Sequence, residues 1–314
     1  MSGNFLKAAK QGIHDWRVYL LGTAVSIGFW VAGFWIVNTP IHRLIEREAV
    51  LKGDSLDSEF TQLQVQQIIQ DSAILSYILI TAPFIFLCIG IFFVIKVLHQ
   101  RKILTLISAD AAFNQQRFLS GFFIWLLLAC VQTSFEYGFT PHHFAWNFDP
   151  GQWLSFLPVA LILTPIQTSA EEFLFRSYFM QALGLFIRQP LFLAIAVSLP
   201  FALVHFSNPE MERGALWIGL TYFALAMFLA LITLKDDRLE LALGVHAANN
   251  LFIVLLVNTQ DSALRSPAII LQTVPTDPRI TLLALLLMMG AFYLIVFGRQ
   301  GRGRVESSQS RVKS

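Results

Sequence analysis

Long runs of apolar residues alternate with short polar segments along the chain. A helix needs about 20 apolar residues to cross the hydrocarbon core of a bilayer. Measured against that length, the pattern predicts about eight transmembrane helices, and hence an all-α fold built as a polytopic transmembrane helical bundle. The predicted helices lie near residues 18–37, 73–97, 118–134, 153–187, 190–206, 214–234, 239–257 and 280–297.

The basic residues lie mostly on one side of this predicted arrangement. When the N-terminus is placed in the cytoplasm, every segment on that side holds at least two Lys or Arg residues, whereas residues 136–152 on the other side hold none. An excess of Lys and Arg marks the cytoplasmic loops of membrane proteins. We therefore expect both termini in the cytoplasm. The short loops and the basic C-terminal segment favour a bacterial protein of the plasma (inner) membrane.

The polar segments are too short or too polar to form a separate soluble domain, so we expect a single integral membrane domain over residues 1–314. Residues 40–71 carry apolar residues at helical spacing, which predicts that they extend the helices beyond the bilayer or lie on its surface. Residues 299–314 are expected to form a disordered cytoplasmic tail.

The composition agrees with a surface that faces lipid. Hydrophobic residues make up 55% of the chain and charged residues only 13%, where soluble domains carry about 25%. Membrane lipid is therefore an expected partner, and the net charge of +2 gives no reason to expect nucleic acid. The two cysteines, Cys88 and Cys130, lie inside apolar runs and form no Cys-x-x-Cys pair, so we expect neither a zinc ribbon nor a redox motif. We expect no cofactor.

Ionisable side chains inside a predicted span are candidate functional residues, because burying them in lipid is costly. The first group is Glu171-Glu172-Phe-Leu-Phe-Arg176. Glu172 and Arg176 are four residues apart, share one helix face and can pair. Glu171 lies about 100° away around the helix and has no partner within its own turn, which leaves its carboxylate available for chemistry. The alternative interpretation is a charge cluster at a helix end on the membrane surface.

Two further groups lie in the fifth and seventh predicted spans. His205 follows Phe201 by four residues, and a lone His in such a place is more often a satisfied core residue than a catalytic one. His246 and Asn250 are also four apart and share a face, whereas Asn249 points elsewhere. Hydrogen bonds between helices are the alternative role for these side chains, most of all for Asn249.

The three groups are expected at a similar depth. Glu171 and His205 each lie about 25 Å from the turn that joins the fourth and fifth spans, at 1.5 Å per residue. The seventh span enters from the same side, so His246 and Asn250 come level with them or lie somewhat shallower. If these helices pack side by side, the polar groups meet in one layer.

The ordered set of motifs resembles the CPBP family. That family contains the type II CAAX prenyl endopeptidases and bacterial proteins linked to bacteriocin processing and immunity. The resemblance covers residues 153–256, the expected catalytic core, and the N-terminal spans carry no motif. The motifs are Glu171-Glu172-x-x-x-Arg176, Phe201-x-x-x-His205 and His246-x-x-x-Asn250.

The resemblance implies a glutamate-dependent intramembrane endopeptidase without a metal. Glu171 would be the general base that activates water, and His205 would orient or polarise that water. His246 and Asn250 would stabilise the oxyanion. Peptide hydrolysis needs both kinds of group, a base for water and donors aimed at the developing negative charge.

The resemblance also assigns supporting roles. Glu172 with Arg176 would hold the catalytic helix in register, and Phe201 belongs to the second motif. Ser177 stands where the family usually has Gly, a mild departure. The implied substrate is a membrane-associated or lipidated peptide or protein. A prenylated C-terminus needs a eukaryotic-style prenylation system, so another membrane-associated peptide fits a bacterial chain better.

Two alternatives from other classes remain. A zinc metalloprotease could use His205, His246 and Glu171 as ligands, although the chain has no His-Glu-x-x-His. A non-enzymatic scaffold or immunity protein would bind partners through its loops, and the polar layer would then only join helices. A transporter is disfavoured because no internal duplication is visible.

Overall fold

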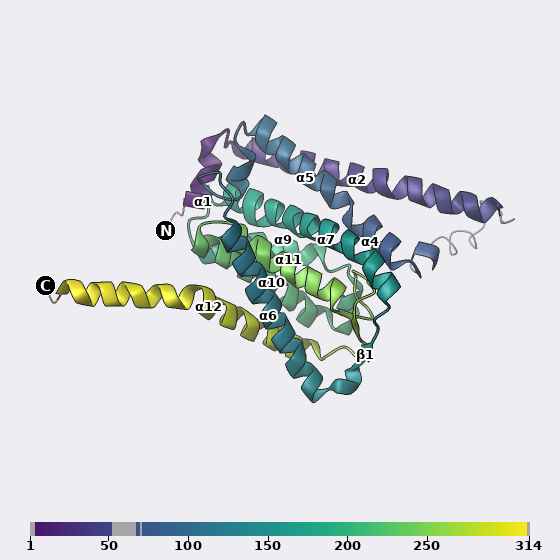
Figure 1. Cartoon of the computed structure of the whole chain (residues 1–314). Helices are drawn as coiled ribbons and strands as arrows, with labels where there is room; N and C mark the ends of the chain where they lie inside the picture. Colours follow the sequence, from purple (N-terminus) through teal and green to yellow (C-terminus); the bar gives the residue numbers. More distant parts are fainter. Residues whose placement is uncertain (1–3, 52–66, 70, 313–314) are drawn as a thin grey trace.

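The computed structural model describes residues 4–51, 67–69 and 71–312, with the side chains of residues 48–51 and 299–312 left out. It is an assembly of α-helices with one small sheet (Figure 1). The helices are α1 (Asn4–Lys7), α2 (Trp16–Leu51), α4 (Ala73–Thr81), α5 (Pro83–Phe93), α6 (Gln115–Phe139), α7 (Pro150–Glu172), α8 (Met180–Leu183), α9 (Pro190–Val204), α10 (Ala215–Asp236), α11 (Glu240–Leu255) and α12 (Pro278–Val312). Short 3₁₀ or π segments are η1 (Ala8–Gln11), η2 (Val94–Leu98), η3 (Ile103–Leu106), η4 (Pro141–His143), η5 (Phe173–Phe179) and η6 (Pro209–Arg213).

Two of the helices that carry the predicted site, α7 and α9, begin at clear local signals. The Asp149 carboxylate accepts a hydrogen bond from the Gln152 backbone N–H at 2.9 Å, and Pro150 occupies the first position of α7. Gln189 and Pro190 begin α9 in the same manner. A side-chain cap satisfies one of the free N–H groups of the first turn, and Pro loses nothing there because it has no N–H.

Helix α11 lies in the interior of the bundle. It packs against α6 on one side and α7 on the other, α7 packs against α5, and α5 against α2 (Figure 1). Helix α10 packs against α9, α11 and α12. Gly244 and Gly121 allow the close approach of α11 and α6, since a Cβ atom on either glycine would collide with backbone atoms of the other helix.

All eight predicted apolar runs are helical, and the all-α transmembrane bundle is confirmed. Within the part of the chain that the structure describes, six helical stretches have the length and apolar composition to cross a membrane. The other two, α9 with 15 residues and α11 with 16, are shorter than a full crossing, so a count of eight complete spans is not confirmed.

The shortening of α9 and α11 has a visible structural cause. After α11 the chain forms β2 (Val257–Thr259), which pairs in parallel with β3 (Ile270–Gln272), and β3 pairs antiparallel with β1 (Phe144–Trp146). Such three-residue strands carry no readable alternation, and the sequence analysis did not predict them. Non-helical backbone is tolerated at membrane depth only where its polar groups are satisfied within the protein, and in this sheet β3 is paired on both sides, by β1 and by β2.

A side-chain ion pair fixes the other irregular segment, between α9 and α10. Arg213 donates two hydrogen bonds to the Asp261 carboxylate, at 2.5 and 2.6 Å, and a third to Thr259 at 3.0 Å. The loop after His205 is thereby tied to the segment that follows α11. This contact lies beyond the ends of the two short helices, α9 and α11.

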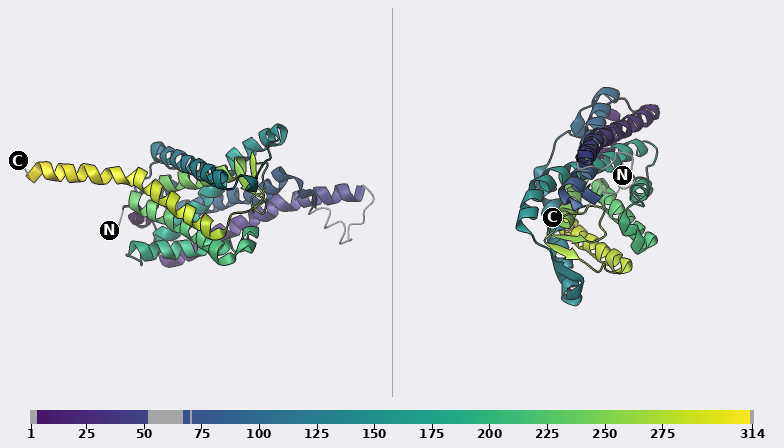
Figure 2. Two further views of the ribbon diagram at one scale, coloured as in Figure 1. Left: turned by 90° about the horizontal axis from the view of Figure 1, so that it is seen from below. Right: turned by 90° about the vertical axis from the view of Figure 1, so that its right-hand side faces the viewer.

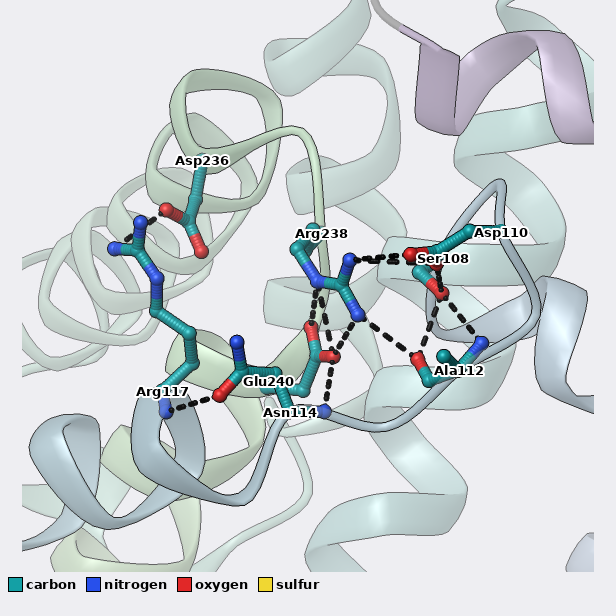
Figure 3. Close-up of polar contacts among 8 residues, drawn as sticks. All are labelled: Ser108, Asp110, Ala112, Asn114, Arg117, Asp236, Arg238 and Glu240. Atoms are coloured by element: carbon teal, nitrogen blue, oxygen red, sulfur yellow. Dashed lines mark hydrogen bonds and ion pairs between the residues drawn. The ribbon is translucent and has the colours of Figure 1, made fainter.

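A charged network at the opposite end holds the start of α11 (Figure 3). Arg238 lies at its centre and donates to the carboxylates of Glu240, at 2.8 Å, and Asp110, at 3.1 Å. Glu240 is fully buried and also accepts the Asn114 backbone N–H at 2.9 Å. The hydrogen bond from Ser108, followed by that from Arg238, lowers the pKa of Asp110. The network fixes the first turn of α11, six residues before His246.

The last part of α12 extends away from the bundle (Figure 1). Its backbone is helical as far as Val312, where the sequence analysis expects disorder. The side chains of residues 299–314 lie outside the part that the structure describes, and disorder of this tail stays a prediction.

The described N-terminal residues and the end of α12 lie at the same end of the bundle, opposite the sheet (Figures 1 and 2). We expect tags at both termini to be accessible only from the cytoplasm. A tag in the loop of residues 140–148 should be accessible only from the other side. Protease protection in spheroplasts and inverted vesicles measures this, and a C-terminus on the outer side would contradict the predicted orientation.

Candidate active site

The predicted site begins on a continuous helical stretch, Pro150–Leu183, in which α7 continues without a break into η5 and α8. Glu171 and Glu172 are the last two residues of α7, and Arg176 lies in η5, which is a π-helical segment. Such π-bulges are rare within helices and frequent at functional sites. The two carboxylates therefore lie at the point where the geometry of the helix changes.

Glu172 and Arg176 form the predicted ion pair. Arg176 Nη1 donates to Glu172 Oε1 at 2.8 Å, and both side chains are fully buried. The guanidinium also lies over the ring of Phe201, 4.1 Å from its centroid, in a cation–π contact. Phe201, predicted as a supporting residue, thus connects α9 to the charged pair.

Glu171 has a different set of neighbours. Its side chain is buried with 7% exposed, and Oε1 accepts a hydrogen bond from Gln167 Nε2 at 2.7 Å. The sequence analysis gave Glu171 no partner within its own turn, and this is wrong because Gln167 lies four residues earlier on the same helix face and donates to it. The other oxygen, Oε2, faces His246 Nε2 at 3.6 Å.

His246 lies between the two glutamates. Its Nδ1 is 2.8 Å from Glu172 Oε1, which is already paired with Arg176 and can only accept, so we assign the proton to Nδ1. In the neutral ring, Nε2 then presents its lone pair towards Glu171. The 3.6 Å separation is too long for a direct hydrogen bond, and a water molecule can bridge polar groups at such a separation.

Asn250 joins this group through Gln167. Asn250 Nδ2 donates to Gln167 Oε1 at 3.1 Å, so the same amide contacts both the carboxylate of Glu171 and the side chain of Asn250. Asn249 is held by the interhelical bond that the sequence analysis considered, since it accepts from Trp125 Nε1 on α6 at 3.2 Å. It also donates to Asn250 Oδ1 at 3.1 Å.

His205 lies at the C-terminal cap of α9, at the edge of the group. Its ring lies between Phe201 and Tyr222, with both centroid distances 4.5 Å. Nδ1 must donate to the Phe201 carbonyl at 2.7 Å, which leaves Nε2 as the free nitrogen of the neutral ring.

The structure thus brings Glu171, His246 and Asn250 together through direct contacts or Gln167. It places His205 next to them, across the ring of Phe201.

Three residues of this site were missed by sequence reasoning. Gln167 had a usable signal, its i−4 spacing from Glu171. Trp125 and Tyr222 had none, since an aromatic residue in an apolar helix is most simply explained by packing. Tyr222 also accepts a hydrogen bond from Asn208 at 2.9 Å, which steadies the ring that stacks on His205.

Among the residues that the structure describes, no group of three or more His, Cys, Asp or Glu side chains is arranged to hold a metal ion. The set considered for zinc consists of Glu171, His205 and His246. Both ring nitrogens of His246 face carboxylates, and Nδ1 of His205 is bound to the backbone.

Comparison with known proteins gives two matches. Residues 150–252 match the family described as Type II CAAX prenyl endopeptidase Rce1-like, and that range includes every predicted site residue. The chain is also 30% identical over 269 residues to the uncharacterized protein YyaK of Bacillus subtilis (strain 168), which covers 82% of this chain and 83% of that relative. No solved structure matches.

Proposed function

Because the chain belongs to the family of Rce1-like type II CAAX prenyl endopeptidases, we propose that it is an intramembrane endopeptidase in which Glu171 activates water. The proposed substrate is a membrane-associated or lipidated peptide or protein. The transmembrane bundle supports this class, since a peptide held at the membrane reaches a buried site without leaving the bilayer.

The observation that carries the proposal is that two adjacent buried carboxylates, Glu171 and Glu172, have different hydrogen-bond and ion-pair partners. Glu172 is tied to Arg176 and to His246 Nδ1 through one oxygen, so its charge is neutralised within the protein. Glu171 accepts from a neutral amide on Oε1, while Oε2 faces His246 across 3.6 Å. A free carboxylate oxygen opposite an imidazole nitrogen is an arrangement that can hold and deprotonate water.

The proposed reaction uses the residues as follows. Glu171 takes a proton from water while the water oxygen forms a bond to the peptide carbonyl carbon. Asn250 stabilises the oxyanion that results through its remaining N–H group, and His246 joins it as an imidazolium, which carries a proton on Nε2 as well as on Nδ1. His205 orients the water through its free Nε2. Glu171 then returns the proton to the leaving amine as the C–N bond breaks. The products are a carboxylate and an amine.

A cleavage assay on the purified full chain tests this function. Quenched fluorescent peptides, some carrying a farnesyl group, are incubated with the protein in lipid nanodiscs, with and without EDTA and 1,10-phenanthroline. We expect cleavage that survives exhaustive chelation, because the proposed chemistry depends on a carboxylate base. Loss of activity with chelator and recovery with zinc would move the assignment to a zinc protease. Absence of cleavage across the library would favour a scaffold or immunity protein.

A further inference from the structure

A row of hydrogen bonds connects the candidate base to a helix on the far side of α11. The row runs from Trp125 on α6 through Asn249 and Asn250 on α11 to Gln167 and Glu171 on α7. Trp125 is fully buried, and Gln167 and Glu171 are buried as well.

The two ends of the row fix the orientation of every amide in it. An indole N–H can only donate, and an ionised carboxylate can only accept. Asn249 must therefore turn its oxygen to Trp125, which turns its NH₂ group to Asn250. Asn250 then accepts from Asn249 and donates to Gln167, and Gln167 donates to Glu171. Each residue in the row therefore donates to the next one, towards Glu171. Reversing any amide would bring two donors or two acceptors face to face in a buried site.

The direction of these hydrogen bonds determines which atom of the Asn250 side chain is free to contact a substrate. Its oxygen is occupied by the Asn249 NH₂ group, and one of its two N–H groups is occupied by Gln167. The remaining N–H is the group that an oxyanion needs. An Asn250 side chain without these neighbours could present its oxygen instead, which would repel the negative charge of the transition state.

From these contacts we propose that Gln167 is a positioning residue that aligns the base Glu171 and the oxyanion donor Asn250 together, and that Trp125 and Asn249 set its orientation. The expected effect on kcat rests on the proposed function. The hydrogen-bond relay itself is a property of the protein without substrate.

The first test compares Gln167→Met with a matched control. Methionine keeps the length of the side chain and removes both hydrogen bonds, so kcat on the best peptide of the library should fall about 10- to 100-fold from misalignment, with KM nearly unchanged. The control is Gln132→Met, because Gln132 donates to Glu136 at 3.0 Å with the same i,i+4 spacing, at the outer end of α6. That variant should keep the wild-type kcat.

The second test addresses the direction of the relay. Asn249→Asp keeps the acceptor for Trp125 but removes the donor to Asn250, so kcat should fall as in Gln167→Met. If the relay ran the other way, Asp would keep accepting from Asn250 and kcat would be unchanged. The melting temperature of each variant, measured in the same nanodiscs, separates misalignment from loss of fold.

A measurement that needs no substrate tests the hydrogen-bond relay separately from the proposed endopeptidase activity. The chain has seven tryptophans, and ¹⁵N labelling of their indole groups gives few enough signals for Trp125→Phe to identify the one from Trp125. Gln167→Met should accelerate hydrogen exchange of this indole N–H, because Asn249 loses its fixed orientation. If wild-type protein cleaves nothing, the proposed function fails while faster exchange still supports the relay. Unchanged exchange, or faster exchange with unchanged kcat, overturns the inference.

Discussion

Glu171→Gln is expected to lower turnover by a factor on the order of 10²–10⁴, the usual contribution of a general base. The amide cannot take a proton from water. It preserves the local contacts, since its oxygen still accepts from Gln167 Nε2 and its NH₂ group can face the lone pair of His246 Nε2. The protein should therefore insert and remain folded, with little change in melting temperature.

The measurement is the turnover of Glu171→Gln on the best peptide of the library, beside its melting temperature in the same nanodiscs. Gln132→Met serves again as the control for a substitution in a helix away from the site. Full activity of Glu171→Gln would remove Glu171 from the role of base. It would favour a function in which the polar cluster only joins helices.

Glu172→Gln is expected to cause the largest loss of stability. Arg176 is fully buried and loses the carboxylate that balances its charge. Removing one partner of a buried pair costs about 3–5 kcal/mol, because the remaining charge is left uncompensated. His246 keeps an amide oxygen as the acceptor for Nδ1 but loses the charge-assisted bond that holds the proton there, so we expect reduced turnover, with part of the activity kept in the protein that survives.

Thermal unfolding in one lipid composition measures this effect. Asp110→Asn is the matched control, since the Asp110 side chain is 61% exposed and its pair with Arg238 is in contact with solvent. The double variant Glu172→Gln/Arg176→Met removes both buried charges and should regain much of the lost stability. If Glu172→Gln were fully stable but inactive while Glu171→Gln stayed active, the two glutamates would have exchanged roles.

The sequence predicted the features that depend on local geometry. Apolar runs predict helices in a membrane because length and composition alone decide whether a segment can cross lipid. The Glu172–Arg176 pair was predicted because residues four apart lie side by side on any helix. Motifs on three separate helices predicted which further side chains belong to the site, and the structure brings them together or next to one another.

The sequence pattern did not predict where α9 and α11 end. Their apolar runs continue past Val204 and Leu255, yet both helices end there. The segment after α11 forms β2, which pairs with β3 and through it with the distant β1, and the Arg213–Asp261 pair ties the loop after α9 to this segment. A helix end decided by partners far away in sequence leaves no local signal.

The rotation of each helix about its own axis was decided by tertiary packing alone. Helical spacing shows that His246 and Asn250 share a face, but it does not show which neighbour that face meets. Packing of α11 between α6 and α7 turns it so that His246 contacts both glutamates and Asn250 meets Gln167. Local sequence thus predicted which residues belong to the candidate site. Only the packed bundle determined which of them touch, because contacts between helices depend on the shapes of both surfaces.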